Sequence, residues 1–173
     1  LAKSFGAVVA ASEVTIEVPS GQKLCLIGSN GAGKTTFVNM VTGYLKPDSG
    51  TIELDGEAIT GLAPRAIARK GICRSFQIPQ LCIELTAEEN RLVAIAAAEP
   101  RGLSFWADPA ASGRDARARE LLDRFGLLAM ADRPVSEMPG GMRKLLDIAM
   151  ALARRPRLLL LDEPTSGVSA EEK

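Results

Sequence analysis

This 173-residue sequence has no excess of positive or negative charge, no long apolar run and no closely spaced pair of cysteines. Lysine plus arginine and aspartate plus glutamate balance at 21 each, whereas a general nucleic-acid binder is usually basic. The longest apolar stretch, near residues 92–98, is far too short to span a bilayer, and no signal peptide is visible. Cys25, Cys73 and Cys82 show no Cys-x-x-Cys spacing, which predicts structural thiols in a reduced, cytosolic chain.

The apolar residues that are present alternate between strand-like and helix-like spacing. This alternation predicts one α/β domain with a mostly parallel sheet, and the region from about 78 to 140 reads as an inserted, mainly helical subdomain. Turn signals around "TIEL" add a small antiparallel element within residues 47–60. The expected strands are 14–18, 23–28, 72–76 and 157–162. The expected helices are 34–43, 63–70, 86–98 from the capping box of Thr86 and Glu89, one through 118–125 closed by Gly126, and 142–154.

Three glycines, a lysine and two threonines are concentrated in "IGSNGAGKTT" (27–36), directly after an apolar run. The spacing fits the P-loop pattern G-x-x-x-x-G-K-[ST] between a strand and a helix, where backbone N–H groups and the helix N-terminus bind phosphate. The alternative is a glycine-rich turn that binds nothing. The expected phosphate-binding residues are Gly28, Ser29, Asn30, Gly31, Ala32, Gly33, Lys34, Thr35 and Thr36, with Lys34 on the β- and γ-phosphates and Thr35 on Mg²⁺.

Two adjacent acids end a second apolar strand, "LLLLDE" (158–163). Such a pair is costly to bury unless a cation or hydrogen bonds compensate for it. Asp162 is therefore expected to hold Mg²⁺ beside the P-loop. The alternative is a salt-bridged strand end without a metal.

Taken together, these residues resemble the ATP-binding subunit of ABC transporters over nearly the whole chain. The motifs "FG" (5–6), the P-loop, "RSFQIPQL" (74–81), "MPGGMRKLLDIAMALARRP" (138–156) and "LLLLDEPTSGVS" (158–169) occur in the family order. The sequence around Gln77 and the long segment that follows it are most similar to subunits of branched-chain amino acid importers. The resemblance implies an ABC-type P-loop NTPase fold with ATP and Mg²⁺ as ligands.

The resemblance also implies roles for single residues. Phe5 matches the aromatic residue that stacks on adenine, although a core phenylalanine is the alternative. Gln77 matches the glutamine that reaches Mg²⁺ and the attacking water. Glu163 matches the general base that polarises this water, a type of catalysis that typically contributes ~10²–10⁴-fold.

Residues 138–142 match the signature loop, usually Leu-Ser-Gly-Gly-Gln, which in the family covers the nucleotide of the opposite subunit in a head-to-tail dimer. Gly140, Gly141 and the following helix can still offer N–H donors and a positive dipole end. Pro139 replaces the serine, and it has neither hydroxyl nor N–H, so one contact to the γ-phosphate is lost. Met142 replaces the glutamine, and Ser169 stands where many members carry aspartate.

The sequence also departs from the family in its histidine content. Family members have a histidine that contacts the γ-phosphate, and this sequence contains no histidine. Ser169 and Glu172 form a capping box that begins a helix, yet the chain stops at Lys173, so we predict a C-terminally incomplete fragment. Within residues 1–173 we expect one ABC-type domain, with 1–77 and 156–173 as its core and 78–155 as the helical subdomain.

The leading functional hypothesis is an ATPase that powers a membrane permease for import of a small solute. It would be a peripheral subunit on the cytoplasmic face of the membrane, paired with a second, identical or different, ATP-binding subunit. The expected permease contacts are residues 77–85 and, unless they anchor their own loop, Leu103, Phe105 and Trp106. The alternative is a non-transport ABC-type ATPase on nucleic acid or ribosomes, which the neutral charge disfavours. A P-loop kinase or GTPase is a third class, disfavoured because no Asn-Lys-x-Asp motif is present.

Overall fold

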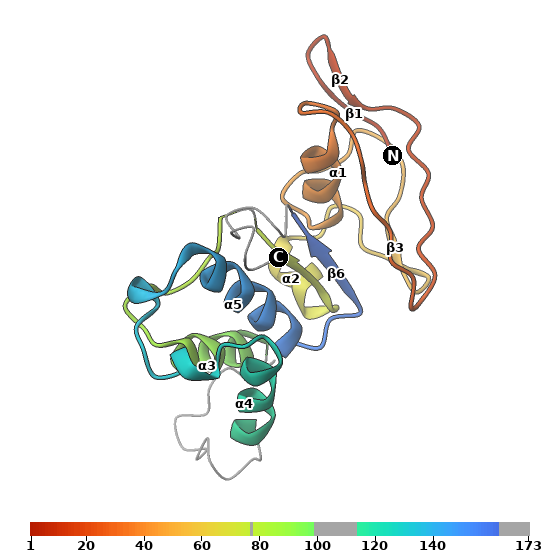
Figure 1. The fold of residues 1–173 in the computed structure, drawn as a ribbon. Coiled ribbons are helices and arrows are strands. Elements are labelled where there is room, and N and C mark those ends of the chain that lie inside the picture. Colours follow the sequence, from red (N-terminus) through yellow and green to blue (C-terminus); the bar gives the residue numbers. More distant parts are fainter. Residues whose placement is uncertain (77, 99–113, 163–173) are drawn as a thin grey trace. The chain divides into compact units, whose positions relative to one another are not determined.

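The computed structural model describes residues 1–76, 78–98 and 114–162. The chain divides into two units, Leu1–Ala68 and Arg69–Lys173, and each is treated by itself below (Figure 1). The sequence-based division into a core and a helical subdomain stays a prediction. None of the helices that fall within the described ranges is long and apolar enough to cross a membrane.

The first unit is built from two short hairpins and two helices. In the second hairpin, Asp55 and Gly56 both adopt positive φ (50° and 78°), as a two-residue turn between twisted strands requires. This confirms the predicted antiparallel element, whereas the first hairpin was not predicted. The elements are β1 (Lys3–Phe5) paired with β2 (Val8–Ala11), α1 (Lys34–Val41), β3 (Glu53–Leu54) paired with β4 (Glu57–Ala58), and α2 (Pro64–Arg69), which reaches into the second unit by one residue.

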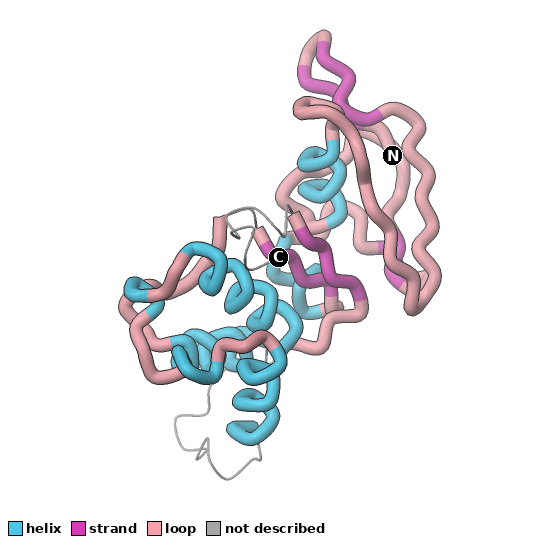
Figure 2. Tube along the Cα trace, in the orientation of Figure 1, coloured by secondary structure: helices cyan, strands magenta, loops and turns pink. Residues whose placement is uncertain are grey.

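The two strands predicted at 14–18 and 23–28 are wrong, because both segments are loop (Figure 2). Val14 exchanges backbone hydrogen bonds with Leu1, but no described strand of the first unit pairs with the apolar run that precedes the P-loop. Without such a neighbour the side chains stay accessible, and Ile27 is 91% exposed. Cys25, expected in an apolar strand, is exposed as well.

The second unit contains the parallel pair that the sequence predicts. Strand β5 (Ile72–Ser75) runs beside β6 (Leu158–Leu161), with Ile72 opposite Leu158 and Ser75 opposite Leu161. Cys73 on β5 is buried, and desolvation raises the pKa of its thiol. The helices of this unit are α3 (Ala87–Ala98), α4 (Arg114–Arg124) and α5 (Gly140–Ala153). Two 3₁₀ turns, Leu128–Met130 and Val135–Glu137, lie between α4 and α5.

Local capping explains where these helices begin and end. The capping box before α3 is formed as predicted: Thr86 N–H donates to Glu89 Oε2 (2.8 Å), and Glu89 N–H donates to Thr86 Oγ1 (3.1 Å). After α4, Gly126 has φ 66°, its N–H donates to Asp123, and Leu127 N–H donates to Leu122, which makes a Schellman motif.

The core of the second unit lies between α3, α4 and α5 (Figure 1). On α5, Leu146 is buried in this core and Leu145 is half-buried against it. The buried cluster comprises Ala87, Leu122, Leu127, Ala131, Val135, Met138 and Leu146. This packing fixes α5, and therefore its first turn at Gly140, within the unit.

Candidate functional site

The P-loop of the first unit has the backbone shape of an anion-binding loop. Gly31 and Gly33 adopt left-handed φ values of 84° and 83°, and Ala32 N–H donates to Ser29 O (3.2 Å) between them. Left-handed φ at every second residue turns successive backbone N–H groups toward one concave side of the loop. Helix α1 starts immediately afterwards at Lys34, with its first bond from Phe37 N–H to Gly33 O (2.9 Å). The loop and the helix N-terminus therefore fit a phosphate.

The side chain of Lys34 arches back over this loop. Its Nζ donates to the carbonyl oxygens of Gly28 (2.5 Å) and Ser29 (2.8 Å). The ammonium group is thus already held at the loop, where it can contact a bound polyphosphate. Thr35, the expected Mg²⁺ ligand, is exposed in the first turn of α1, and Thr36 is half-buried next to it. Asn30 is exposed in the preceding turn.

Phe5 lies at the end of β1 in the same unit and is 52% exposed, so the alternative of a core phenylalanine does not hold. The Lys3 ammonium lies 5.6 Å from the centre of its ring. The same ammonium pairs with Asp48 (2.6 Å), whose carboxylate also accepts Ser4 N–H (2.8 Å). These contacts, led by the Lys3 hydrogen bond, lower the pKa of Asp48. Stacking of Phe5 on adenine stays a prediction.

The requirement for glycine at position 33 can be tested with a neighbouring glycine as control. A Cβ added to Gly33 would lie 2.1 Å from Ala10 O on β2, whereas one added to Gly31 meets no atom within 4 Å. Both positions carry the positive-φ cost of about 1–3 kcal/mol for a residue with a side chain. We expect Gly33→Ala to lower the free energy of unfolding in urea by clearly more than Gly31→Ala. Equal losses would contradict the close approach of β2.

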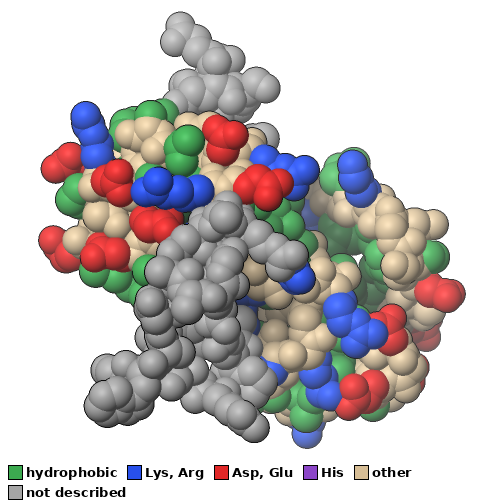
Figure 3. All heavy atoms as spheres, turned by 90° about the horizontal axis from the view of Figure 1, so that it is seen from below, with side chains coloured by type: hydrophobic (Ala, Val, Ile, Leu, Met, Phe, Trp, Pro, Cys, Tyr) green, Lys and Arg blue, Asp and Glu red, His purple; other side chains and the backbone are tan. Residues whose placement is uncertain are grey.

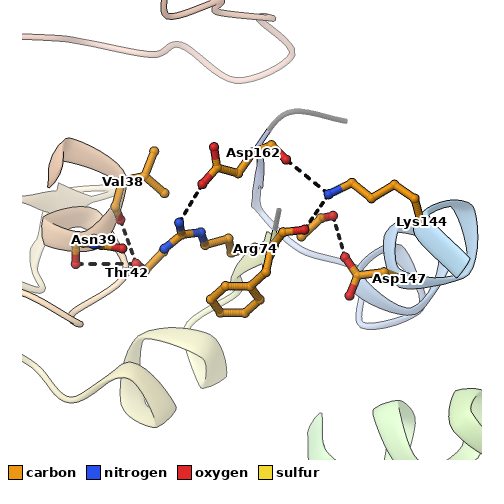
Figure 4. A network of polar contacts seen from close by, with 9 residues as sticks. Val38, Asn39, Thr42, Arg74, Lys144, Asp147 and Asp162 are labelled. Atoms are coloured by element: carbon orange, nitrogen blue, oxygen red, sulfur yellow. Dashed lines mark hydrogen bonds and ion pairs between the residues drawn. The ribbon is translucent and has the colours of Figure 1, made fainter. Parts of the chain in front are cut away.

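Asp162 follows β6 directly and is ion-paired in the second unit. Its Oδ2 lies 2.7 Å from Nη2 of Arg74, and the guanidinium also stacks on Phe76, 4.8 Å from the ring centre (Figure 4). The structure therefore contains the salt bridge that was the sequence-based alternative for this strand end. Sequence reasoning missed Arg74, although a cation was expected near these acids.

Lys144 and Asp147 of α5 are two further buried residues that sequence reasoning did not single out. Asp147 accepts the Ser75 hydroxyl (2.6 Å), and Lys144 donates to two backbone carbonyls (Figure 4). Burial raises the pKa of Asp147, and the hydrogen bond from Ser75 is the largest opposing contribution. Opposite charges three residues apart on one helix were the available signal.

Gly140 and Gly141 occupy the first turn of α5, two residues earlier than the sequence predicted the helix to begin. Pro139 stands at the N-cap and makes no side-chain capping bond. The Arg143 side chain bonds the backbone that precedes the signature glycines, donating to Met138 O (2.8 Å) and Ser136 O (2.7 Å). The signature segment therefore ends in a helix N-terminus with the polarity expected of an anion site.

Gln77, Glu163 and the aromatic loop containing Leu103, Phe105 and Trp106 lie outside the described residues. The structure brings the P-loop residues together in the first unit. In the second unit it brings Asp162 together with Arg74 and Lys144. On the face shown in Figure 3, the Lys/Arg and Asp/Glu side chains of the described residues are interspersed, without a stripe of one sign.

Comparison with known proteins agrees with these observations. The family model described as "ABC transporter" matches residues 11–166. The branched-chain amino acid transport ATP-binding proteins BraF of Pseudomonas aeruginosa and LivG of Escherichia coli K12 are each 38% identical to this chain. The alignments cover 99% and 97% of this chain and 70% and 68% of those proteins.

Solved structures give the same result for the fold. The ADP conformation of MJ1267, an ATP-binding cassette of an ABC transporter, matches with a TM-score of 0.81 and 34% identity. A nucleotide-free ATP-binding cassette matches with a TM-score of 0.79 and 34% identity. Both comparisons cover 97% of this chain and 68% of the other. The chain therefore belongs to the ABC transporter family, and it is one of the ATP-binding ATPase subunits of that family.

Proposed function

We propose that this chain binds MgATP at its P-loop and hydrolyses it to power a permease that imports branched-chain amino acids. The observation that carries the proposal is the paired left-handed glycines, Gly31 and Gly33, at the N-terminus of α1 with the Lys34 ammonium held over the loop. A loop of this shape supplies N–H donors and a positive charge to a phosphate chain.

Each site residue then has a defined task. Lys34 binds the β- and γ-phosphates, and the oxygen ligands Thr35, Asp162 and Gln77 hold Mg²⁺, which prefers such donors. Bound Mg²⁺ supplies charge neutralisation on the phosphates. Glu163 accepts the proton of the attacking water as the general base. The exposed ring of Phe5 is available for stacking on adenine.

The remaining parts of the proposal concern the assembly. Gly140 and Gly141 at the start of α5 offer N–H donors to the nucleotide of a second ATP-binding subunit, and Pro139 weakens this contact because it offers no hydroxyl. Residues 77–85 contact the permease, and among the described residues of this segment Ile78 and Ile83 are exposed. The subunit sits peripherally on the cytoplasmic face of the membrane. The solute class rests on the similarity to BraF and LivG, which are branched-chain amino acid transport ATP-binding proteins.

Transport by the purified complex tests the proposal. The protein, isolated with the membrane subunits that accompany it, is placed in proteoliposomes, and uptake of radiolabelled leucine is measured with and without MgATP. We expect ATP-dependent uptake that unlabelled isoleucine and valine inhibit and lysine does not. ATP-dependent uptake of lysine but not leucine would contradict the solute class. ATP hydrolysis stimulated by DNA or RNA, with no permease present, would contradict a role in transport.

A further inference from the structure

Helix α5 buries a lysine and an aspartate on the side that faces the two parallel strands. Lys144 is 1% exposed and Asp147 is 8% exposed, although side chains of these types are almost never fully buried without partners. Lys144 donates to the backbone just beyond the ends of β5 and β6, and Asp147 accepts from Ser75 at the end of β5. Their position therefore reflects what those strand ends require.

The ammonium of Lys144 joins the two strand ends. Its Nζ donates to Phe76 O, one residue beyond β5, and to Asp162 O (3.1 Å), one residue beyond β6. Among the described residues, Asp162 N–H donates to Ser75 O (3.3 Å) at this end of the strand pair. Lys144 thus supplies a donor to one partly buried carbonyl just beyond each strand.

Asp147 holds the same region from the next turn of α5. Its Oδ2 accepts the hydroxyl of Ser75 (2.6 Å), a residue that is completely buried, and its Oδ1 accepts Gln80 N–H (3.4 Å). The chain on both sides of position 77 is thereby bonded to one carboxylate. Figure 4 shows Lys144 and Asp147 projecting from α5 toward these strand ends.

The residues held in this way are the immediate neighbours of the expected catalytic groups. Phe76 precedes Gln77, and Asp162 precedes Glu163. We propose that Lys144 and Asp147 are positioning residues for ATP hydrolysis, which fix the backbone entering Gln77 and Glu163 against the helix that begins at the signature glycines. This inference rests on the proposed function. A displacement of about 1 Å in such a site can cost on the order of 10²-fold in rate.

A purely structural role makes a different prediction. Lys144→Met removes the donor of two backbone carbonyls and leaves Asp147 without a nearby cation, so it lowers stability in either case. If Lys144 served stability alone, the variant would have a lower Tm, but its folded form would turn over ATP at the wild-type kcat. The proposal instead requires that turnover falls while nucleotide binding, which depends on the P-loop of the first unit, is retained.

The test uses the full protein together with its membrane subunits. For Lys144→Met we expect kcat at saturating MgATP to fall roughly 10–100-fold, with the Kd of a fluorescent ATP analogue within twofold of wild type. Lys144→Arg keeps the charge and should recover part of the rate. Asp147→Asn gives a second variant of nearly unchanged size and should lower kcat about tenfold. Leu145→Ala, which removes packing on the core side of α5, is the control and should lower Tm with little effect on kcat.

Hydrogen–deuterium exchange without nucleotide gives a readout independent of activity. We expect faster exchange in Lys144→Met for peptides covering residues 74–82 and 160–163, with α3 unchanged. A kcat within twofold of wild type for Lys144→Met or Asp147→Asn would overturn the inference, as would an equal loss in Leu145→Ala. Wild-type protein that hydrolyses no ATP would instead overturn the proposed function, and the inference with it.

Discussion

Lys34→Ala should abolish measurable nucleotide binding. In the structure the ammonium makes two hydrogen bonds to carbonyls of the P-loop, so its side chain already reaches the place where phosphate oxygens are expected. Two charge-assisted hydrogen bonds at about 1.5–3 kcal/mol each correspond to a Kd raised roughly 10²–10⁴-fold. Titration with MgATP in a calorimeter measures the change.

Lys23→Ala is the matched control for this variant, because Lys23 is an exposed lysine of the same unit five residues before the loop begins its turn at Gly28. It should bind MgATP with wild-type affinity. The Tm of Lys34→Ala should also stay close to wild type, since the bonds it loses are exposed. Unchanged MgATP affinity in Lys34→Ala would show that the P-loop is not the phosphate site.

Features set by short-range rules were predictable from the sequence. The capping box of Thr86 and Glu89, the helix closure at Gly126 and the start of α1 at Lys34 each depend on residues within about one turn. The spacing of the P-loop glycines belongs to the same class, because left-handed φ at Gly31 and Gly33 is a local property. The family motifs then identified the site without knowledge of tertiary contacts.

Features that depend on a distant partner were not predictable in this way. Alternation in 14–18 and the apolar run 23–28 indicate a surface suited to a sheet, but a strand also needs a paired neighbour, and the first unit offers none among its described strands. Lys144 and Phe76 are 68 positions apart, and Arg74 and Asp162 are 88 apart. In the sequence, such charges look like a solvated helix face or an unpaired acid.

The ion pair of Arg74 and Asp162 also refines the expectation for the acidic strand end. A cation was required there to compensate for burial, and a guanidinium on the neighbouring strand supplies it. Arg74 engages one carboxylate oxygen, Oδ2, so the arginine compensates for the charge in the structure while the Mg²⁺ role of Asp162 remains a proposal. The salt bridge and the metal site are therefore not exclusive alternatives.

Glu163→Gln should lower ATP hydrolysis by ~10²–10⁴-fold while leaving nucleotide affinity intact. The amide has nearly the size of the carboxylate but cannot accept the proton of the attacking water. The preceding residue is fixed independently of this side chain, because Asp162 N–H donates to Ser75 O and Asp162 O accepts from Lys144. The substitution therefore removes the base without releasing the backbone that leads to it.

Steady-state phosphate release by the full protein with its membrane subunits measures the rate, and retention of α-labelled nucleotide after gel filtration measures binding. We expect the variant to retain intact ATP rather than ADP, because binding persists while cleavage is slow. Glu53→Gln, an exposed carboxylate on β3, is the control and should hydrolyse ATP at the wild-type rate. Wild-type turnover in Glu163→Gln would disprove its assignment as the base. Loss of nucleotide retention would instead indicate that Glu163 acts in binding, since only a group used after binding can be removed without affecting affinity.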